Sequence, residues 1–388
     1  MERVLLLRQI PLTDPQGKAF VYGVPDLVAR RLHYVDQRCS GEVAMPEVVT
    51  ADEQARRHYL VNSLMEEAIR SSQLEGATTT RAVAKEMLRT GREPQDRGER
   101  MILNNYLALQ YMRDQMDERL TPGAVMELQR ILTEGTLDNP SAAGRLQHSD
   151  EIRVSVIDSF DGTVMHHPPP AEQLPERLKR MCDFVNEADT ADRFIHPVIR
   201  AILLHFWLAY DHPFEDGNGR TARALFYWYM RTRRYWLVEY LSISKILRGA
   251  PAQYSRAFLY TETDERDVTY FIVHQLEVIE RAVDQLHEYL RKQVSEVREV
   301  ERLLRGSDRF NHRQLALLGN ALRGSDARYL FQAHAASYGV THETARNDLL
   351  QLAKMGLLEQ RREGRRYSFS PPLDLAERLK ALGQPSIT

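Results

Sequence analysis

The sequence has few cysteines, little net charge and no long apolar run, and each of these features excludes a class of protein. Cys39 and Cys182 are its two cysteines, which is too few for a disulfide framework, and they lack a zinc-binding spacing. The net charge of −2 gives the chain as a whole no preference for nucleic acid or for a membrane surface. The apolar runs are too short for a signal peptide or a membrane span. We therefore expect a cytoplasmic protein, without a membrane partner, whose 388 residues form two or three domains.

The most informative stretch is residues 212–223, which reads His-Pro-Phe-Glu-Asp-Gly-Asn-Gly-Arg-Thr-Ala-Arg. The segment before it, Ile199–Tyr210, is apolar nearly all round, and the segment after it, Ala222–Arg231, is rich in aliphatic and aromatic residues. These patterns predict two buried helices. Pro213 disfavours continuation of the first helix, and the two glycines permit a tight turn. The sequence thus predicts a polar loop held between two core helices.

Several residues of this loop suit the binding of a phosphorylated ligand. Gly217 and Gly219 would let backbone N–H groups approach an anion at the positive N-terminus of the second helix. Arg220 and Arg223 are three residues apart on that helix and could clamp phosphate oxygens. Asn218 could donate a hydrogen bond to phosphate.

Two further loop residues suit catalysis. Asp216 would repel a bare phosphate, but it suits a Mg²⁺ ion that bridges the carboxylate and the phosphates. His212 has an ordinary pKa of about 6.5, which suits a general base. The alternative is a glycine-rich turn with solvated charges. We reject it because so many phosphate-binding residue types fall within twelve residues.

The pattern His-Pro-Phe-x-Asp-Gly-Asn-Gly-Arg-x-x-Arg resembles, without departure, the signature of the Fic family, whose best-known members are protein adenylyltransferases. The resemblance implies that His212 deprotonates a target hydroxyl and that Asp216 binds Mg²⁺. It implies that the triphosphate of ATP is held by Gly217, Asn218, Gly219, Arg220 and Arg223. The reaction implied is transfer of AMP from ATP to a Ser, Thr or Tyr hydroxyl of a target protein or of the chain itself, with release of pyrophosphate. Tyr254 corresponds to a family position beside the adenine, although a core tyrosine would explain it equally well.

A second motif precedes the loop, at the end of a helix predicted to begin near Ala51. Ser71-x-x-x-Glu75-Gly76 resembles the inhibitory motif of the Fic family. The resemblance implies that Glu75 pairs with Arg223 and obstructs the γ-phosphate. Taken alone, Glu75 is a solvated charge at a helix end where carboxylates are unfavourable.

The expected fold is mainly α: a Fic-type helical core with a β-hairpin flap, followed by a C-terminal winged helix-turn-helix domain. We divide the chain into an N-terminal helical region with the inhibitory helix at 1–110, the catalytic core at 111–298 and the winged helix at 299–388. Residues 1 to about 50 predict an irregular arm with one short helix around Val24–Tyr34. The flap is predicted within 139–170, with its turn at Asp161-Gly162. His166 and His167 in this stretch are interpreted as loop histidines, because no third ligand stands at metal-binding spacing.

The C-terminal part of the chain is richer in Lys and Arg than in Asp and Glu. It predicts a turn and helix over 338–350 and a basic hairpin over 356–369, an order that resembles a winged helix. Four arginines of the hairpin could contact DNA phosphates: Arg361, Arg362, Arg365 and Arg366. A winged helix can also bind protein or form a dimer, and the expected recognition helix is near neutral, with Glu343 and Asp348 against Arg346 and Lys354. We favour protein interaction over DNA binding and expect a homodimer.

Three functional hypotheses follow. The first is an autoinhibited, Mg²⁺-dependent adenylyltransferase, in which Glu75 could also support removal of AMP. The second is a DNA-binding regulator whose Fic core senses nucleotide without turnover, and the intact His212 argues against it. The third keeps the fold but changes the transferred group: Gly219 stands where phosphate-transferring relatives carry Lys, whereas phosphocholine transfer stays open.

Overall fold

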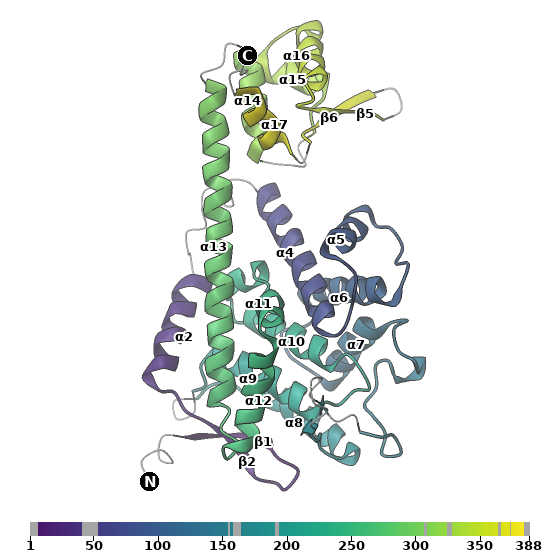
Figure 1. Cartoon of the computed structure of the whole chain (residues 1–388), viewed down its shortest axis with the longest axis vertical. Helices are drawn as coiled ribbons and strands as arrows, with labels where there is room; N and C mark the ends of the chain where they lie inside the picture. Colours follow the sequence, from purple (N-terminus) through teal and green to yellow (C-terminus); the bar gives the residue numbers. More distant parts are fainter. Residues whose placement is uncertain are drawn as a thin grey trace. The chain divides into compact units, whose positions relative to one another are not determined.

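The structure, a computed structural model, is mainly helical as expected (Figure 1). It describes residues 7–40, 53–153, 156–157, 164–190, 194–305, 309–323, 328–363, 366–372 and 374–383. Within these ranges the strands form three separate two-stranded sheets. No helix in these ranges is long and apolar enough to cross a bilayer.

The described residues fall into two compact units. The first comprises those within 1–43 and 60–284, and the second those within 44–59 and 285–388. The boundary expected at residue 110 therefore lies inside the first unit. The segments on both sides of it pack into one body that carries the loop.

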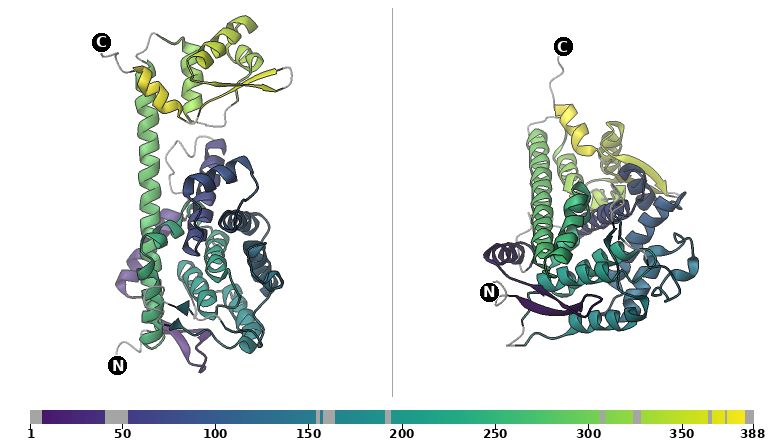
Figure 2. Two further views of the ribbon diagram at one scale, coloured as in Figure 1. Left: turned by 45° about the vertical axis from the view of Figure 1, so that its right-hand side comes forward. Right: turned by 60° about the horizontal axis from the view of Figure 1, so that its bottom comes forward.

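The N-terminal segment differs from the irregular arm expected there. β1 (Arg8–Thr13) and β2 (Ala19–Tyr22) form an antiparallel hairpin, and α2 (Asp26–Cys39) extends beyond the short helix predicted. The hairpin lies beside the start of α13 (Thr269–Arg305), where the Val21 N–H donates to Arg266 (Figure 2). The apolar alternation that buries one face of each strand spans too few residues to be read in the sequence, and Pro11 interrupts β1.

The segment after α2 contains the helix expected to begin near Ala51, followed by further helices. They are α4 (Glu53–Leu74), α5 (Arg81–Thr90), α6 (Arg97–Asp114) and α7 (Pro122–Thr133). Thr80, Asp96 and Thr121 cap α5, α6 and α7, and each accepts a hydrogen bond from a backbone N–H of the first turn. The short antiparallel pair β3 (Val156–Ile157) and β4 (Val164–His166) lies where the flap was expected, while its predicted turn falls outside the described residues.

The core of the first unit is built on α9 (Pro197–Asp211) and α10 (Asn218–Thr232), which pack on each other. Every residue from Val198 to Leu208 is buried, because α9 is apolar nearly all round. Further helices pack around this pair: α8 (Leu174–Asn186), the 3₁₀ helix η3 (Trp236–Tyr240), α11 (Ile243–Gly249) and α12 (Pro251–Thr263). The two short 3₁₀ helices η1 (Pro140–Ala142) and η2 (Ala171–Gln173) complete the chain trace. The loop at 212–217 is thus supported on both sides by buried helices.

The second unit contains α14 (His312–Arg323), α15 (Phe331–Tyr338), α16 (His342–Lys354), the hairpin of β5 (Glu359–Glu363) and β6 (Arg366–Ser370), and α17 (Leu375–Gly383). An apolar cluster that includes Leu318, Leu349 and Phe369 forms its core. The element order follows the one expected for a winged helix.

Candidate functional site

The loop between α9 and α10 has a conformation defined by its own side chains. His212 ends α9 in the left-handed region, with φ 46° and ψ 52°, and Gly217 begins α10 with φ 84°. Phe214 is fully buried and anchors the loop. The Asn218 amide accepts from the Phe214 N–H at 2.9 Å and donates to the Phe214 carbonyl at 2.8 Å. Asn218 therefore closes the loop, and both ends of its amide are engaged in doing so.

His212 is half-buried at the C-terminal end of α9. Burial lowers the pKa of His212 to about 4, against the opposing charge of Glu75 and a hydrogen bond to the Ala209 carbonyl. The imidazole is thus neutral at pH 7. Because one ring nitrogen donates to Ala209, the other carries the lone pair and is the proton acceptor.

Asp216 and Arg220 are paired within the loop. Arg220 Nη2 lies 3.1 Å from Asp216 Oδ2, and Arg220 Nη1 donates to the Leu132 carbonyl of α7 at 2.9 Å. Arg220 is fully buried, whereas 34% of the Asp216 side chain is exposed. Arg220 therefore connects the loop to α7, and the Asp216 carboxylate lies on the solvent-accessible side of the loop.

Arg223 faces α4 and joins the two motifs. Its Nε donates to Ser71 Oγ at 2.9 Å, and its Nη2 donates to the Ser71 carbonyl at 3.1 Å and to Glu75 Oε1 at 2.8 Å. Arg223 and Ser71 are each 2% exposed. The pair of Glu75 and Arg223 expected from the sequence is present. Gly76, with φ 92°, follows the end of α4 and lets the chain turn there.

Glu75 also lies against the first turn of α10. A Cβ placed on Gly219 would overlap the Glu75 carboxylate. Gly219 therefore leaves room for an anionic group at the helix N-terminus, where free N–H groups and the helix dipole favour negative charge. In this structure the anion at that position is Glu75.

Tyr254 of α12 lies close to Arg223 but is packed among aromatic side chains. Its hydroxyl is 2.8 Å from His205 Nε2, and its ring centroid is 5.3 Å from that of Phe258. Burial raises the pKa of Tyr254 to about 12 and lowers that of His205 to about 3. Tyr254 is thus held in the core by its hydroxyl, while the residue as a whole is half-buried.

The structure adds supporting residues that the sequence reading did not single out. Gln129 of α7 donates to the Asp216 carbonyl at 2.9 Å and accepts from the Gly144 N–H at 2.6 Å. Arg153 donates to the Asp211 carbonyl, next to His212, at 2.7 Å. Gln129 lies on the same face of α7 as buried Val125 and Leu132. A polar residue on an apolar helix face is the one feature of the sequence that could have indicated its supporting role.

His166, interpreted from the sequence as a loop histidine, is buried. Its Nε2 lies 2.6 Å from the Tyr210 carbonyl and its Nδ1 lies 2.8 Å from Glu262 of α12. It therefore ties the end of β4 to α9 and α12. Within the described part of the chain, no group of three or more His, Cys, Asp or Glu side chains could hold a metal ion by itself.

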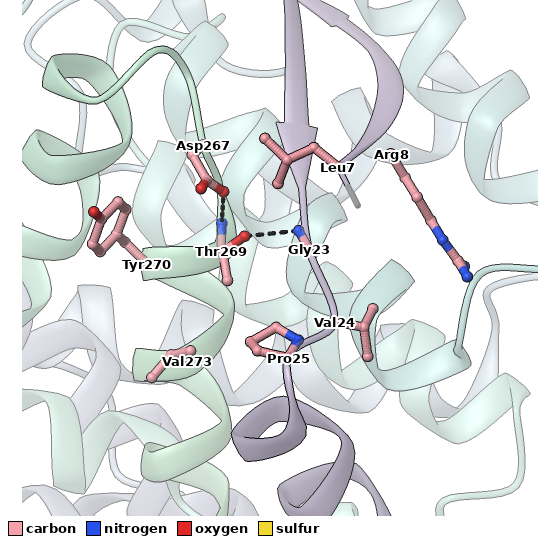
Figure 3. Close-up of a pocket in the computed structure, with 9 residues that line it drawn as sticks. All are labelled: Leu7, Arg8, Gly23, Val24, Pro25, Asp267, Thr269, Tyr270 and Val273. Carbon is pink, nitrogen blue, oxygen red and sulfur yellow. Dashed lines mark hydrogen bonds between the residues drawn. The ribbon is translucent and has the colours of Figure 1, made fainter. Parts of the chain in front are cut away.

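A pocket of about 600 Å³ lies elsewhere in the first unit, between the N-terminal hairpin and α13 (Figure 3). Leu7, Val24, Pro25 and Val273 give it apolar walls, and Thr269 is engaged with the Gly23 N–H at 2.8 Å. No residue of the 212–223 loop lines it. It is thus separate from the loop.

Residues 119–230 match the model of the Fic/DOC family. The chain is 31% identical over 163 residues to a protein adenylyltransferase Fic of Nematostella vectensis and 29% identical over 210 residues to one of Drosophila willistoni. These matches cover 40% and 52% of this chain but only 34% and 38% of the relatives. The matched region therefore spans well under half the length of these curated relatives.

Solved structures share the fold. A Fic family protein from Desulfovibrio desulfuricans G20 superposes with a TM-score of 0.57 at 18% identity, over 91% of this chain and 98% of that one. A Fic domain-containing signalling protein from Bacteroides thetaiotaomicron gives a TM-score of 0.50 at 19% identity, over 68% and 96% of the two chains. The chain thus contains a region, residues 119–230, that matches the Fic/DOC family, and it shares its fold with solved Fic proteins.

Proposed function

We propose that the chain transfers AMP from ATP to a hydroxyl of a protein Ser, Thr or Tyr residue. The observation that carries the proposal is the neutral imidazole of His212, held at the end of α9 beside an N-terminus of α10 built to receive an anion. The names of the relatives, protein adenylyltransferase, support the same reaction. A protein that only sensed nucleotide would need no base at this position.

In the proposed reaction, His212 removes the proton of the target hydroxyl and the hydroxyl oxygen attacks the α-phosphorus of ATP. The bond to the bridging oxygen breaks, and pyrophosphate leaves with the electron pair. The N–H groups at Gly217–Gly219 and the Arg223 guanidinium are the groups suited to the phosphates. Arg220 acts by holding Asp216 and the loop, since its guanidinium is buried between Asp216 and the Leu132 carbonyl of α7.

Asp216 is the residue of the site that fits Mg²⁺. Its carboxylate is partly accessible and is held by Arg220, and one carboxylate combined with phosphate oxygens matches the usual Mg²⁺ donor set. The ion would neutralise phosphate charge. We expect Asp216→Ala to lower transfer, without restoration by moderate extra Mg²⁺, because the carboxylate both places the ion and orients Arg220. Transfer indifferent to Asp216 and to a chelator would contradict this role.

Glu75 is proposed as a brake on the transfer. Its carboxylate lies against Gly219 and is paired with Arg223, so it competes with phosphate for both. ATP could still enter, but a displacement of its phosphates by about 1 Å can lower the rate on the order of a hundredfold. Glu75 could also act on a water molecule that hydrolyses AMP from a modified protein, so removal of AMP stays part of the proposal.

The experiment that tests the transfer is incubation with ATP labelled at the α-phosphate and cell lysate. We expect label on proteins with the wild type, more label with Glu75→Gly and none with His212→Ala. Labelling that is the same with all three proteins would rule out the transfer. ATP binding by His212→Ala, measured alongside, should stay close to that of the wild type, because the base acts on the hydroxyl.

The second unit supports an additional interaction role. Its order of helices and basic hairpin is that of a winged helix, and Arg361 and Arg362 are exposed on β5. We propose a protein-binding module as its first role and DNA binding as the alternative. The homodimer expected from the sequence stays a prediction.

A further inference from the structure

Glu67 is a buried carboxylate on α4 to which the proposed transfer assigns no task. Only 3% of it is exposed. Glu67 and Ser71 are four residues apart on one face of α4, and Glu75, another four residues on, directly follows Leu74, the last residue of the helix. Ser71 and Glu75 use that face to contact Arg223 of α10. Glu67 uses it to contact the segment that follows α10.

The Glu67 carboxylate accepts three hydrogen bonds from the start of α11. Oε2 accepts from Ser242 Oγ at 2.9 Å and from the Ser244 N–H at 3.2 Å, and Oε1 accepts from Ser244 Oγ at 2.5 Å. Ser242 is the N-cap residue of α11, yet its own side chain makes no capping hydrogen bond. Glu67 thus caps α11 from a different helix. It is the hydrogen-bond acceptor for the Ser244 N–H in the first turn of α11.

The partners of Glu67 and Glu75 are tied to each other. The Tyr227 hydroxyl of α10 accepts from the Ile243 N–H at 2.9 Å and donates to the Leu241 carbonyl at 3.2 Å. The start of α11 is therefore fixed to α10, which carries Arg223. An α-helix advances 1.5 Å and turns about 100° per residue, so two fixed points along α4 define both its rotation and its axial position.

We propose that Glu67 is a positioning residue that holds α4 in the register at which Ser71 and Glu75 meet Arg223. This inference rests on the proposed braking role of Glu75 and adds the means by which the brake is kept in place. It gives a second way to release the brake. A displacement of α4 from α11 would withdraw Glu75 from Arg223 without any change at Glu75 itself.

The test compares AMP transfer by Glu67→Met in two backgrounds, the wild type and Glu75→Gly. Met has a similar volume but cannot accept the three hydrogen bonds, so α4 loses its attachment to α11. We expect Glu67→Met to raise transfer at least about fivefold in the wild-type background. In the Glu75→Gly background we expect less than a twofold change, because there is no longer a brake to position.

Two variants make the test specific. Glu67→Gln should keep transfer within about twofold of the wild type, since its amide can accept from the Ser244 N–H and donate to Ser244 Oγ. Glu99→Met removes another carboxylate that is 3% exposed, one bound to Arg92 and the Gln95 N–H and making no hydrogen bond to α4. It should not raise transfer. If Glu67→Met does not fold, the double substitution Ser242→Ala, Ser244→Ala removes two of the three donors and should raise transfer in the same direction.

Each outcome separates this inference from the proposed function. Transfer by Glu67→Met at or below the wild-type rate, or changed by the same factor in both backgrounds, overturns the positioning role. If Glu75→Gly raises transfer and loss of the Glu67 contacts does not, only this inference is wrong. If Glu75→Gly itself leaves transfer unchanged, the brake is wrong and the inference falls with it.

Discussion

The Glu75 carboxylate lies at the N-terminus of α10, where we propose that the loop holds a phosphate. Its Oε1 is 2.8 Å from Arg223 Nη2. The carboxylate also lies so close to Gly219 that a Cβ at this position would overlap it. Two anions cannot share this position, since like charges at close range repel strongly in a partly buried site. On the proposed function, Glu75 and a phosphate of ATP therefore compete for this position.

We expect Glu75→Gly to raise AMP transfer, including self-modification, by at least about tenfold, which corresponds to roughly 1.4 kcal/mol of activation free energy. The substitution frees Arg223 and removes a negative charge near the phosphates. The combined variant Glu75→Gly, Arg223→Ala should lose that gain because the freed guanidinium is missing. Rates from labelled ATP measure both. Equal rates for the wild type and Glu75→Gly, on self and on lysate proteins, would show that Glu75 is no brake.

The protonation state of His212 can be measured directly. Burial lowers the pKa of its imidazole to about 4, while the charge of Glu75 opposes this shift by stabilising the imidazolium. We expect the His212 ring in the nucleotide-free protein to titrate near pH 4, and Glu75→Gly to move the titration further down. NMR of the ring resonance, assigned with His212→Ala, measures both values. A midpoint near 6.5 would contradict the burial of the base, and an upward move in Glu75→Gly would contradict the effect assigned to the Glu75 charge.

Residues 212–223 and the Ser71–Gly76 motif could be predicted from the sequence because each is a local pattern whose residues are also close in space. Their supports could not. Gln129 and Asp216 form a hydrogen bond although they are 87 residues apart in the sequence, and Glu67 and Ser244 do so at a separation of 177 residues. A polar residue on an apolar stripe shows that a partner is needed, but local periodicity carries no information about which distant segment supplies it.

The helices were predicted better than the strands for a related physical reason. The apolar run of α9 and the 3.6-residue period of α13 each extend over many residues, whereas β1 and β2 are six and four residues long. β2 is further held by hydrogen bonds between Val21 and the backbone of Arg266 and Val268, which are over two hundred residues away. The turn between them, Asp14-Pro15-Gln16-Gly17, has residues typical of a type I turn, but strands this short show too little alternation to be recognised in the sequence.

Asp348 of α16 is the hydrogen-bond acceptor that joins three helices of the second unit. Arg313 Nε donates to it at 2.7 Å, Asn311 at 2.7 Å, and His334 Nε2 lies 3.2 Å away. From the sequence, Asp348 is expected to contribute a negative charge to the surface of the recognition helix. The structure corrects this, since only 4% of the residue is exposed and its charge is used internally.

We expect Asp348→Ala to destabilise the second unit by about 2–3 kcal/mol, because it leaves Arg313 and Asn311 without their acceptor. Burial opposes ionisation of Asp348, but the hydrogen bonds from Arg313, Asn311 and His334 hold its pKa below the usual range. The stabilisation is therefore present above an unfolded-state pKa of about 3.9 and is lost as the pH falls through the lower folded value.

Thermal unfolding of the full chain followed from pH 7 to pH 2 measures this effect. Asp374→Ala is the control, since Asp374 pairs with Arg378 at a position where both side chains are over 40% exposed. It should change stability by less than about 1 kcal/mol. Equal effects of the two substitutions at pH 7 would show that the buried network does not hold the unit together.

For the whole chain, the correction at Asp348 changes the balance of charge that α16 presents. Glu343, Arg346 and Lys354 are exposed on the helix, which leaves a small positive excess instead of neutrality. The exposed arginines Arg361 and Arg362 on β5 add to it. Protein interaction stays our first proposal for this unit, and salt dependence is the property that distinguishes it from DNA binding.

If the second unit binds DNA, duplex affinity of the full chain should fall steeply with salt, with a slope in log K against log salt of about −0.9 for each phosphate contacted. Replacing Arg361, Arg362, Arg365 and Arg366 by Ala should then flatten that slope by about 0.9 for each arginine that contacts phosphate. A matched variant that loses four exposed arginines of the first unit, Arg30, Arg89, Arg97 and Arg248, has the same net charge and should keep the slope. A gel-shift titration over salt measures all three proteins. Absence of any shift at low salt would exclude DNA and leave a protein as the partner, whereas equal slopes for the two variants would show binding by net charge alone.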